Sequence, residues 1–198
     1  MIHERLKTET RHLHDRTEEI AGSEQIMSGN ITLDEYTDIL IRNYLLHLDA
    51  EMILSEWTEW VNHPEMKFQE RLKTEALRRD LDILNVITDQ LPMLNLSQKP
   101  ENHLQALGAM YVLEGATLGG SVIHKRLSTL PQISKAGAFH YYTVYGQEIG
   151  SKWKQFLTIL EGNVSLKEDE EEILKGAELG YQWVQEAFQL DLASLTRE

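Results

Sequence analysis

The sequence has no cysteine, only four prolines and no basic-plus-apolar leader at its start. Without cysteine there is no disulfide, no thiolate metal ligand and no cysteine nucleophile. Any metal or cofactor must therefore be held by His, Asp, Glu or Tyr. We see no run approaching the roughly 20 apolar residues that span a bilayer. We expect a cytoplasmic protein that does not associate with membranes.

Positive charge is also scarce, since 19 Lys and Arg stand against 32 Asp and Glu and the formal net charge is -13. A surface of this sign repels the phosphates of nucleic acids, so we expect no nucleic-acid partner. The deficit is uneven, however. Residues 115–157 contain a single acid, Glu148, and five cations, which are Lys125, Arg126, Lys135, Lys152 and Lys154. This basic stretch could bind an anionic small ligand or an acidic protein, or it could be ordinary solvated charge.

The length of 198 residues, 41% of them hydrophobic, suits a single domain over residues 1–198. Apolar residues recur at helical spacing almost throughout, which predicts an all-α fold. Two capping boxes mark helix starts, one at Thr32 and Glu35 and one at Ser165 and Glu168. We predict loops around residues 21–30 and 91–100. The predicted helical regions are 2–20, 32–60, 65–84 (shorter helices), 101–130, 145–160 and 166–190.

The segment "YVLEGATLGG", residues 111–120, places Gly115, Gly119 and Gly120 inside a predicted helix. Each glycine in a helix interior costs roughly 1 kcal/mol relative to alanine, so something should offset the cost. Gly115 and Gly119 are four residues apart and share one face of the helix. Either the helix bends, or another body approaches the bare backbone more closely than a Cβ would permit. That body could simply be another helix in a close crossing. The spacing alone leaves both explanations open.

The histidines offer a further candidate site. His12 and His14 are two residues apart on a predicted helix, so at most one of them faces any given site. His14 and Glu18 are four apart and share a face, and so do His47 and the residue four positions on, Glu51. Two such pairs can hold a carboxylate-bridged pair of metal ions in a helical bundle. They also occur as ordinary charge pairs on helix surfaces.

Three segments resemble heme oxygenases. "LKTETRHLHDRTEE", residues 6–19, is similar to the proximal helix of that family, and "YVLEGATLGG" is similar to its distal helix, especially in the bacterial branch. "YGQEIGSKWKQFL", residues 145–157, fits the helical segment that follows. The order and separation agree, and the likeness extends through most of the chain. The resemblance implies a heme-oxygenase-like helical bundle with a glycine-kinked distal helix.

The resemblance also implies roles around the heme iron. His14 matches the proximal iron ligand, and Glu18 one turn later would help to orient its imidazole, as ligating histidines generally require. Gly115, Gly119 and Gly120 would lie over the opposite face of the heme. There the kinked helix brings its backbone close to bound oxygen.

Contacts to the heme propionates are implied for three residues. Lys7 matches a lysine that pairs with a propionate, and Tyr111 matches a tyrosine of the bacterial branch near the propionates. Lys154 matches a further propionate contact. Thr158 stands where mammalian-type members have arginine.

One departure from the family pattern concerns Ala116. Mammalian-type enzymes have at this position an aspartate that organises water beside the bound oxygen, and several bacterial ones have serine. A methyl group neither donates nor accepts a hydrogen bond. Any water network must then rest on backbone carbonyls, on Thr117 or on another polar group.

The activity implied is cleavage of heme to biliverdin, carbon monoxide and ferrous iron. Heme would be both substrate and cofactor, dioxygen the co-substrate, and a reductase or ferredoxin-like donor the source of electrons. The basic stretch would contact the propionates and dock an acidic donor. A monomer is compatible with this interpretation. Two alternatives remain: a non-catalytic heme-binding or sensing homologue, suggested by Ala116, and a nonheme dinuclear metal oxidase using the two His-x-x-x-Glu pairs.

Overall fold

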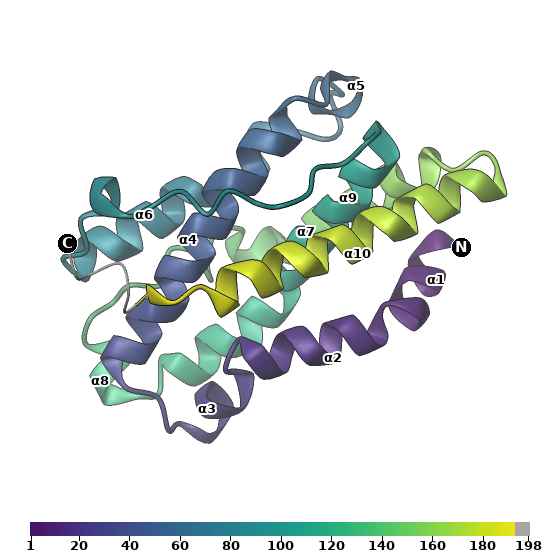
Figure 1. The fold of residues 1–198 in the computed structure, drawn as a ribbon. Helices are drawn as coiled ribbons and strands as arrows, with labels where there is room; N and C mark the ends of the chain where they lie inside the picture. Colours follow the sequence, from purple (N-terminus) through teal and green to yellow (C-terminus); the bar gives the residue numbers. More distant parts are fainter. Residues whose placement is uncertain (193–198) are drawn as a thin grey trace.

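The fold is a bundle of α-helices, shown in Figure 1. A computed structural model describes residues 1–192 but not the side chains of Trp60 and Val61, so residues 193–198 of the predicted domain lie outside the described part. The described residues form helices and no strand, which confirms the predicted all-α fold. The helix α10 runs through the middle of the bundle, with α1 and α2 along one side of it and α4 crossing it (Figure 1).

The prediction of one continuous helix over residues 2–20 is wrong. The structure divides it into α1 (Ile2–Glu9) and α2 (Arg11–Ile20). The division falls at Thr10, whose backbone leaves helical geometry with φ -96° and ψ 7°. Thr10 is buried, and its hydroxyl donates to the carbonyl of Leu6 at 2.8 Å. A polar side chain thus turns inward at the point where the chain changes direction.

Of the next two helices, the first was not predicted and the second begins where it was predicted to begin. A short helix, α3 (Ser23–Ser28), occupies a stretch predicted to be loop, between two glycines with positive φ. The helix α4 (Leu33–Ser55) begins at the predicted capping box, where the Thr32 hydroxyl accepts from the amide of Glu35 at 3.2 Å. It ends at Ser55, earlier than predicted. The connecting elements are α5 (Thr58–Val61), η1 (Phe68–Arg71), α6 (Thr74–Ile83) and η2 (Thr88–Gln90).

The C-terminal half is dominated by two long helices. Its elements are α7 (His103–Leu127), α8 (Pro131–Ser134), η3 (Gly146–Glu148), α9 (Ile149–Gly162) and α10 (Lys167–Gln189). The capping box predicted at Ser165 and Glu168 is wrong. Because the last helix begins at Lys167, its third residue is Asp169, and that carboxylate accepts from the amides of Ser165 and Leu166 at 2.8 Å each.

The helix α7 has two unlike halves. Residues 104–114 are all buried, whereas residues 115–126 include many exposed positions. The helix continues without interruption through its three later glycines, so the kink implied by the resemblance is not a break in the element. Among the described helices it is the one long and apolar enough to cross a membrane, and half of its most apolar window is buried inside the protein. Its composition is that of a central core helix.

The first half of α7 crosses α10 with backbone against backbone. A Cβ atom added at Gly108 would lie 2.0 Å from the carbonyl oxygen of Ile173, and one added at Gly176 would lie 2.0 Å from that of Gln105. One at Gly180 would lie 2.9 Å from a carbonyl oxygen of α7. A close helix crossing of the kind considered for Gly115 and Gly119 is therefore found at Gly108, Gly176 and Gly180 instead. The sequence analysis missed it, although Gly176 and Gly180 have the same four-residue spacing.

We predict that Gly108→Ala destabilises the protein by about 3 kcal/mol, because backbone atoms rather than a flexible side chain occupy the space of the new methyl group. Urea unfolding followed by circular dichroism measures the change. Gly162→Ala at the end of α9 is the control, since nothing lies within 4 Å of its added Cβ. Equal unfolding midpoints for the two variants would contradict the crossing described here.

Candidate functional site

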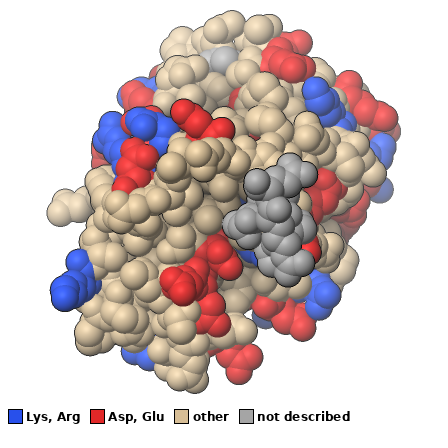
Figure 2. Space-filling view, turned by 60° about the vertical axis from the view of Figure 1, so that its left-hand side comes forward, with Lys and Arg blue, Asp and Glu red and all other residues tan. Residues whose placement is uncertain are grey.

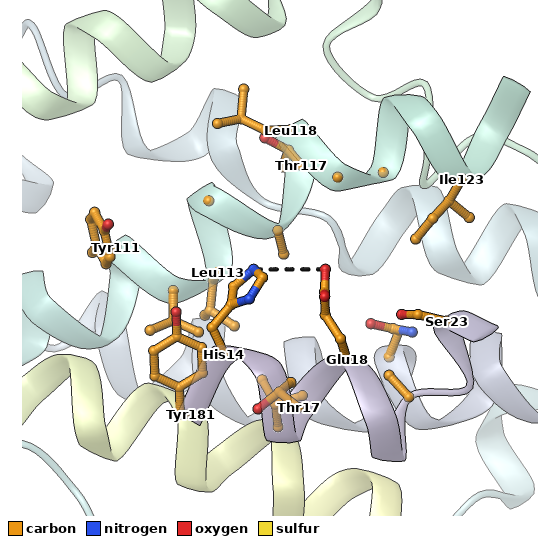
Figure 3. Close-up of a pocket in the computed structure, with 18 of the residues that line it drawn as sticks. His14, Thr17, Glu18, Ser23, Tyr111, Leu113, Thr117, Leu118, Ile123 and Tyr181 are labelled. Carbon is orange, nitrogen blue, oxygen red and sulfur yellow. Dashed lines mark ion pairs between the residues drawn. The ribbon is translucent and has the colours of Figure 1, made fainter. Parts of the chain in front are cut away.

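A cavity of about 620 Å³ lies between α2 and the second half of α7. This volume is within the usual range for small-molecule sites. Figure 3 shows His14 and Glu18 pointing from α2 into the space that faces α7. Lys154 is exposed on α9 and is not among the lining residues. The predicted site residues that do line the cavity are Lys7, His14, Glu18, Tyr111, Gly115, Thr117, Gly119 and Gly120.

His14 offers its imidazole to the cavity, with 54% of the side chain exposed. Its Nδ1 lies 3.5 Å from Oδ1 of Asp15, and its Nε2 lies 3.8 Å from Oε1 of Glu18. The second distance is too long for a hydrogen bond. Asp15, which the sequence analysis did not select, is thus the nearer partner. The ring of Tyr181 on α10 stands edge-on to the imidazole, with the centroids 6.5 Å apart.

The glycines of α7 face this cavity with bare backbone. Nothing lies within 4 Å of a Cβ added at Gly119, and one added at Gly115 would meet the ring of Trp153 at an ordinary 3.6 Å. At Gly120 the nearest atom belongs to Tyr142, at 3.3 Å. No helix crosses at Gly119, so the helix-crossing explanation is wrong there. The backbone at Gly119 is left open toward the cavity.

Basic and aromatic side chains form part of the cavity lining. His3, Lys7 and Arg11 follow one another at four-residue intervals, and all three line the cavity. The hydroxyl of Tyr111 lies 3.5 Å from Nδ1 of His3. Burial raises the pKa of Tyr111 to about 12, so its phenol is neutral at physiological pH. The sequence analysis missed His3 and Arg11, although their spacing from Lys7 gave a signal.

Ala116 and Thr117 both line the cavity, and neither offers a free hydroxyl proton. The Thr117 hydroxyl donates to the carbonyl of Glu114, one turn earlier, at 2.7 Å. Its oxygen can still accept a hydrogen bond. The second half of α7 therefore has little capacity to donate to a ligand or a water molecule.

Polar side chains from other elements also line the cavity. The Tyr141 hydroxyl donates to the side-chain oxygen of Asn43 at 3.1 Å, and Nε2 of His47 lies 3.5 Å from the same hydroxyl. All three residues line the cavity. The sequence analysis did not single out Asn43 or Tyr141 because nothing in the local sequence relates α4 to the loop before α9.

The second His-x-x-x-Glu pair, His47 and Glu51, has a structural role, since Glu51 holds the segment at Lys73 and Thr74. Glu51 accepts from the amide of Lys73 and from the hydroxyl of Thr74, both at 2.6 Å, and its Oε1 lies 3.3 Å from Nδ1 of His47. Burial raises the pKa of Glu51, but these neighbours lower it by more, so the carboxylate is ionised. Within residues 1–192, the one group of three donors close enough to share an ion is His14, Asp15 and Glu18. The structure does not assemble the two pairs into a dinuclear site.

The cations of the basic stretch do not form one surface. Arg126 donates to the carbonyl of Ser28 at 2.9 Å, and Lys152 forms an ion pair with Glu70. On the face shown in Figure 2, acidic and basic side chains are interspersed, with no extensive field of positive charge. The charged side chains therefore lie in small mixed groups and not in one continuous positive surface.

Comparison with known proteins places the chain in a family. A family model described as heme oxygenase matches residues 1–190. A heme oxygenase of Xanthomonas campestris is 29% identical over 150 residues, which are 76% of this chain and 86% of that protein. Heme oxygenase PigA of Pseudomonas aeruginosa is 26% identical over 175 residues, 88% of this chain and 84% of that one. The NO- and CO-bound heme oxygenase of Neisseria meningitidis has the same fold, with a TM-score of 0.74 at 21% identity over 97% of this chain and 94% of that one.

We predict that Gly119→Ala leaves the protein at least as stable as the wild type, with a gain of up to about 1 kcal/mol from higher helix propensity. The space around its Cβ is open, unlike that around Gly108. Urea unfolding of the protein without added ligand measures this. A loss comparable to that of Gly108→Ala would return Gly119 to a role in packing.

Proposed function

The chain belongs to the heme oxygenase family, and we propose that it cleaves heme to biliverdin, carbon monoxide and ferrous iron. Dioxygen is the co-substrate and a reductase or ferredoxin-like protein supplies electrons. The observation that carries the proposal is the pairing, across one cavity, of an accessible histidine with a helix that presents bare glycine backbone.

The residues present fit a heme. One imidazole enters the cavity from α2, and the facing part of α7 has no side chain at Gly119 to obstruct a flat ligand. Cationic side chains of Lys7 and Arg11 also line the cavity, as carboxylates of a ligand would require. Heme, when bound, supplies the redox-active iron and the macrocycle that is cut. The protein supplies ligation, orientation and confinement.

His14 is the proposed iron ligand. A neutral imidazole binds iron through one nitrogen while the other is oriented by a neighbour. Asp15 beside Nδ1 is placed for that task, and Glu18 stands next to Nε2, where it would adjoin the bound ligand. Tyr181 limits rotation of the ring by its edge-on contact.

The opposite wall controls what can approach the open side of the ligand. Gly115, Gly119 and Gly120 bring backbone rather than side chains to this wall, so its shape is set by the helix and not by movable side chains. Thr117 adds a hydroxyl oxygen that can accept a hydrogen bond. Tyr141 and Asn43 provide the polar contacts to water that Ala116 does not.

The propionate end is assigned to Lys7 and Tyr111, with Arg11 beside them. Each charge-assisted contact of this kind contributes roughly 1.5 to 3 kcal/mol where it is partly shielded from water. Lys154, exposed on α9, is a proposed contact at the rim. We further propose that the protein acts in the cytoplasm and that a monomer over residues 1–198 is sufficient for the site.

Ala116 favours one second candidate, a heme-binding or sensing homologue without turnover. It would use the same cavity and the same histidine. The two candidates differ only in whether a reductant, supplied with dioxygen, converts the bound heme to biliverdin.

We predict that His14→Ala removes the spectrum of histidine-ligated ferric heme, because no other histidine lies on the same face of α2. Titration of the purified protein with hemin, followed by its Soret band, measures this. Added imidazole should partly restore the wild-type spectrum in the variant.

His12→Ala is the matched control, since His12 is exposed two residues away and does not line the cavity. It should bind hemin as the wild type does. A wild-type spectrum in His14→Ala, or an equal loss in both variants, would overturn the assignment of His14.

A further inference from the structure

A buried group of charges lies directly behind the cavity wall and has no part in the function proposed above. We call it the Glu114 cluster, and it consists of Arg71, Lys73, Glu114 and Tyr145. Oε1 of Glu114 accepts from Nζ of Lys73 at 2.5 Å and from the Tyr145 hydroxyl at 2.7 Å. Oε2 accepts from Nη1 of Arg71 at 2.5 Å. The side chains of the three charged members are 0 to 2% exposed.

Every member of the cluster is fully engaged. Arg71 also donates to the carbonyl of Met66 at 2.7 Å, and Lys73 donates to the Tyr145 hydroxyl at 2.9 Å. Burial raises the pKa of Glu114, but the charges of Lys73 and Arg71 lower it by more, so the carboxylate is ionised. Well-packed apolar residues are often at least as stabilising as a buried ion cluster. Stability alone therefore does not account for this one.

The cluster reaches the cavity through the ring of Tyr145. That ring lines the cavity, while Nζ of Lys73 lies 4.9 Å and Nζ of Lys152 5.7 Å from its centroid. Gly115 and Trp153, which line the same wall, directly follow Glu114 and Lys152 in the chain. Two ammonium groups thus flank one aromatic ring of the wall.

The charges at this wall do not cancel. The cations Arg71, Lys73 and Lys152 stand against the carboxylates of Glu114, Glu51 and Glu70. Glu114 and Glu51 are shielded from solvent, but Glu70 is 54% exposed, so water and salt screen its charge. Near the cluster, the carboxylate of Glu51 is bound to the backbone amides of Lys73 and Thr74. The opposite wall carries Asp15 and Glu18 beside His14, and Arg11 on the same helix lies 3.6 Å from the carboxylate of Asp15.

We propose that Lys73 and Lys152, acting through the ring of Tyr145, make the cavity select a small anionic ligand over a neutral one on the side facing α7. The side chains of Lys73 and Lys152 are only 2% and 12% exposed, so their charges, 5 to 6 Å from the ring centroid, are screened less than they would be in bulk water. The preference follows from the field of these cations, and no direct contact between them and the ligand is required.

The test compares azide, an anion, with imidazole, a neutral ligand, for affinity to the hemin-loaded protein at low salt. Lys152→Met should lower the ratio of azide to imidazole affinity by about three- to tenfold, and Lys73→Met should lower it as well. Glu70→Gln removes the counter-charge of Lys152 and should raise the ratio. Lys175→Met is the matched control, because this exposed lysine on α10 lies away from the cavity and should leave the ratio unchanged.

Opposite changes in the lysine and glutamate variants are a result that a merely structural role would not produce. An unchanged ratio in Lys152→Met and Lys73→Met, or equal losses of azide and imidazole affinity, would overturn the proposal. Because Lys152 and Glu70 are both near the surface, their variants test it even where Lys73→Met fails to fold.

The azide comparison rests on the proposed function, since it requires bound heme iron. A second comparison uses the protein without heme and two fluorescent dyes, anionic 1-anilinonaphthalene-8-sulfonate and neutral N-phenyl-1-naphthylamine. The wild type should prefer the anionic dye more strongly than Lys152→Met does. A protein that fails to bind hemin but shows this difference would contradict the proposed function alone. Equal dye preferences in the two proteins would contradict the charged wall.

Discussion

The backbone contact between α7 and α10 is the constraint on which the rest of the structure depends. Gly108 and Gly176 each stand where a Cβ would meet a carbonyl oxygen at 2.0 Å, so neither position accepts a side chain while the two helices cross as they do. This crossing fixes the position of the first half of α7. The second half then extends over the cavity. The crossing in the first half therefore determines where the glycines of the second half face α2.

Glu114 marks the boundary between those two halves. Before it, eleven successive positions from 104 to 114 are buried, and after it the glycine-rich segment opens onto the cavity. Its carboxylate joins α7 to the segment around Arg71 and to Tyr145, so the wall beyond the boundary is held by charge as well as by packing. The site therefore combines a histidine flanked by acids on one side with a bare helix backed by cations on the other.

The sequence was sufficient to predict the fold class, most helices and eight of the residues that line the cavity. Hydrophobic periodicity and the capping box at Thr32 are local signals, and the three glycines in "YVLEGATLGG" are visible without a structure. The division of the first helix at Thr10 was not predictable, because it depends on a side chain becoming buried by distant elements.

The same limit explains the missed residues. The contact of Tyr141 with Asn43 and the cluster around Glu114 each join segments far apart in the chain, so no local spacing indicates them. The local sequence also could not separate a glycine used for crossing, such as Gly176, from one used to open a cavity, such as Gly119. That difference depends only on what lies opposite the missing side chain.

The central claim is that this cavity holds heme for oxidative cleavage, and it is tested most directly by a single-turnover experiment. Purified protein loaded with one equivalent of hemin is mixed with ascorbate in air, with catalase present to remove free peroxide, and the products are separated by chromatography. The account predicts loss of the Soret band together with biliverdin and carbon monoxide. Stable reduced heme, with no biliverdin formed, would contradict it.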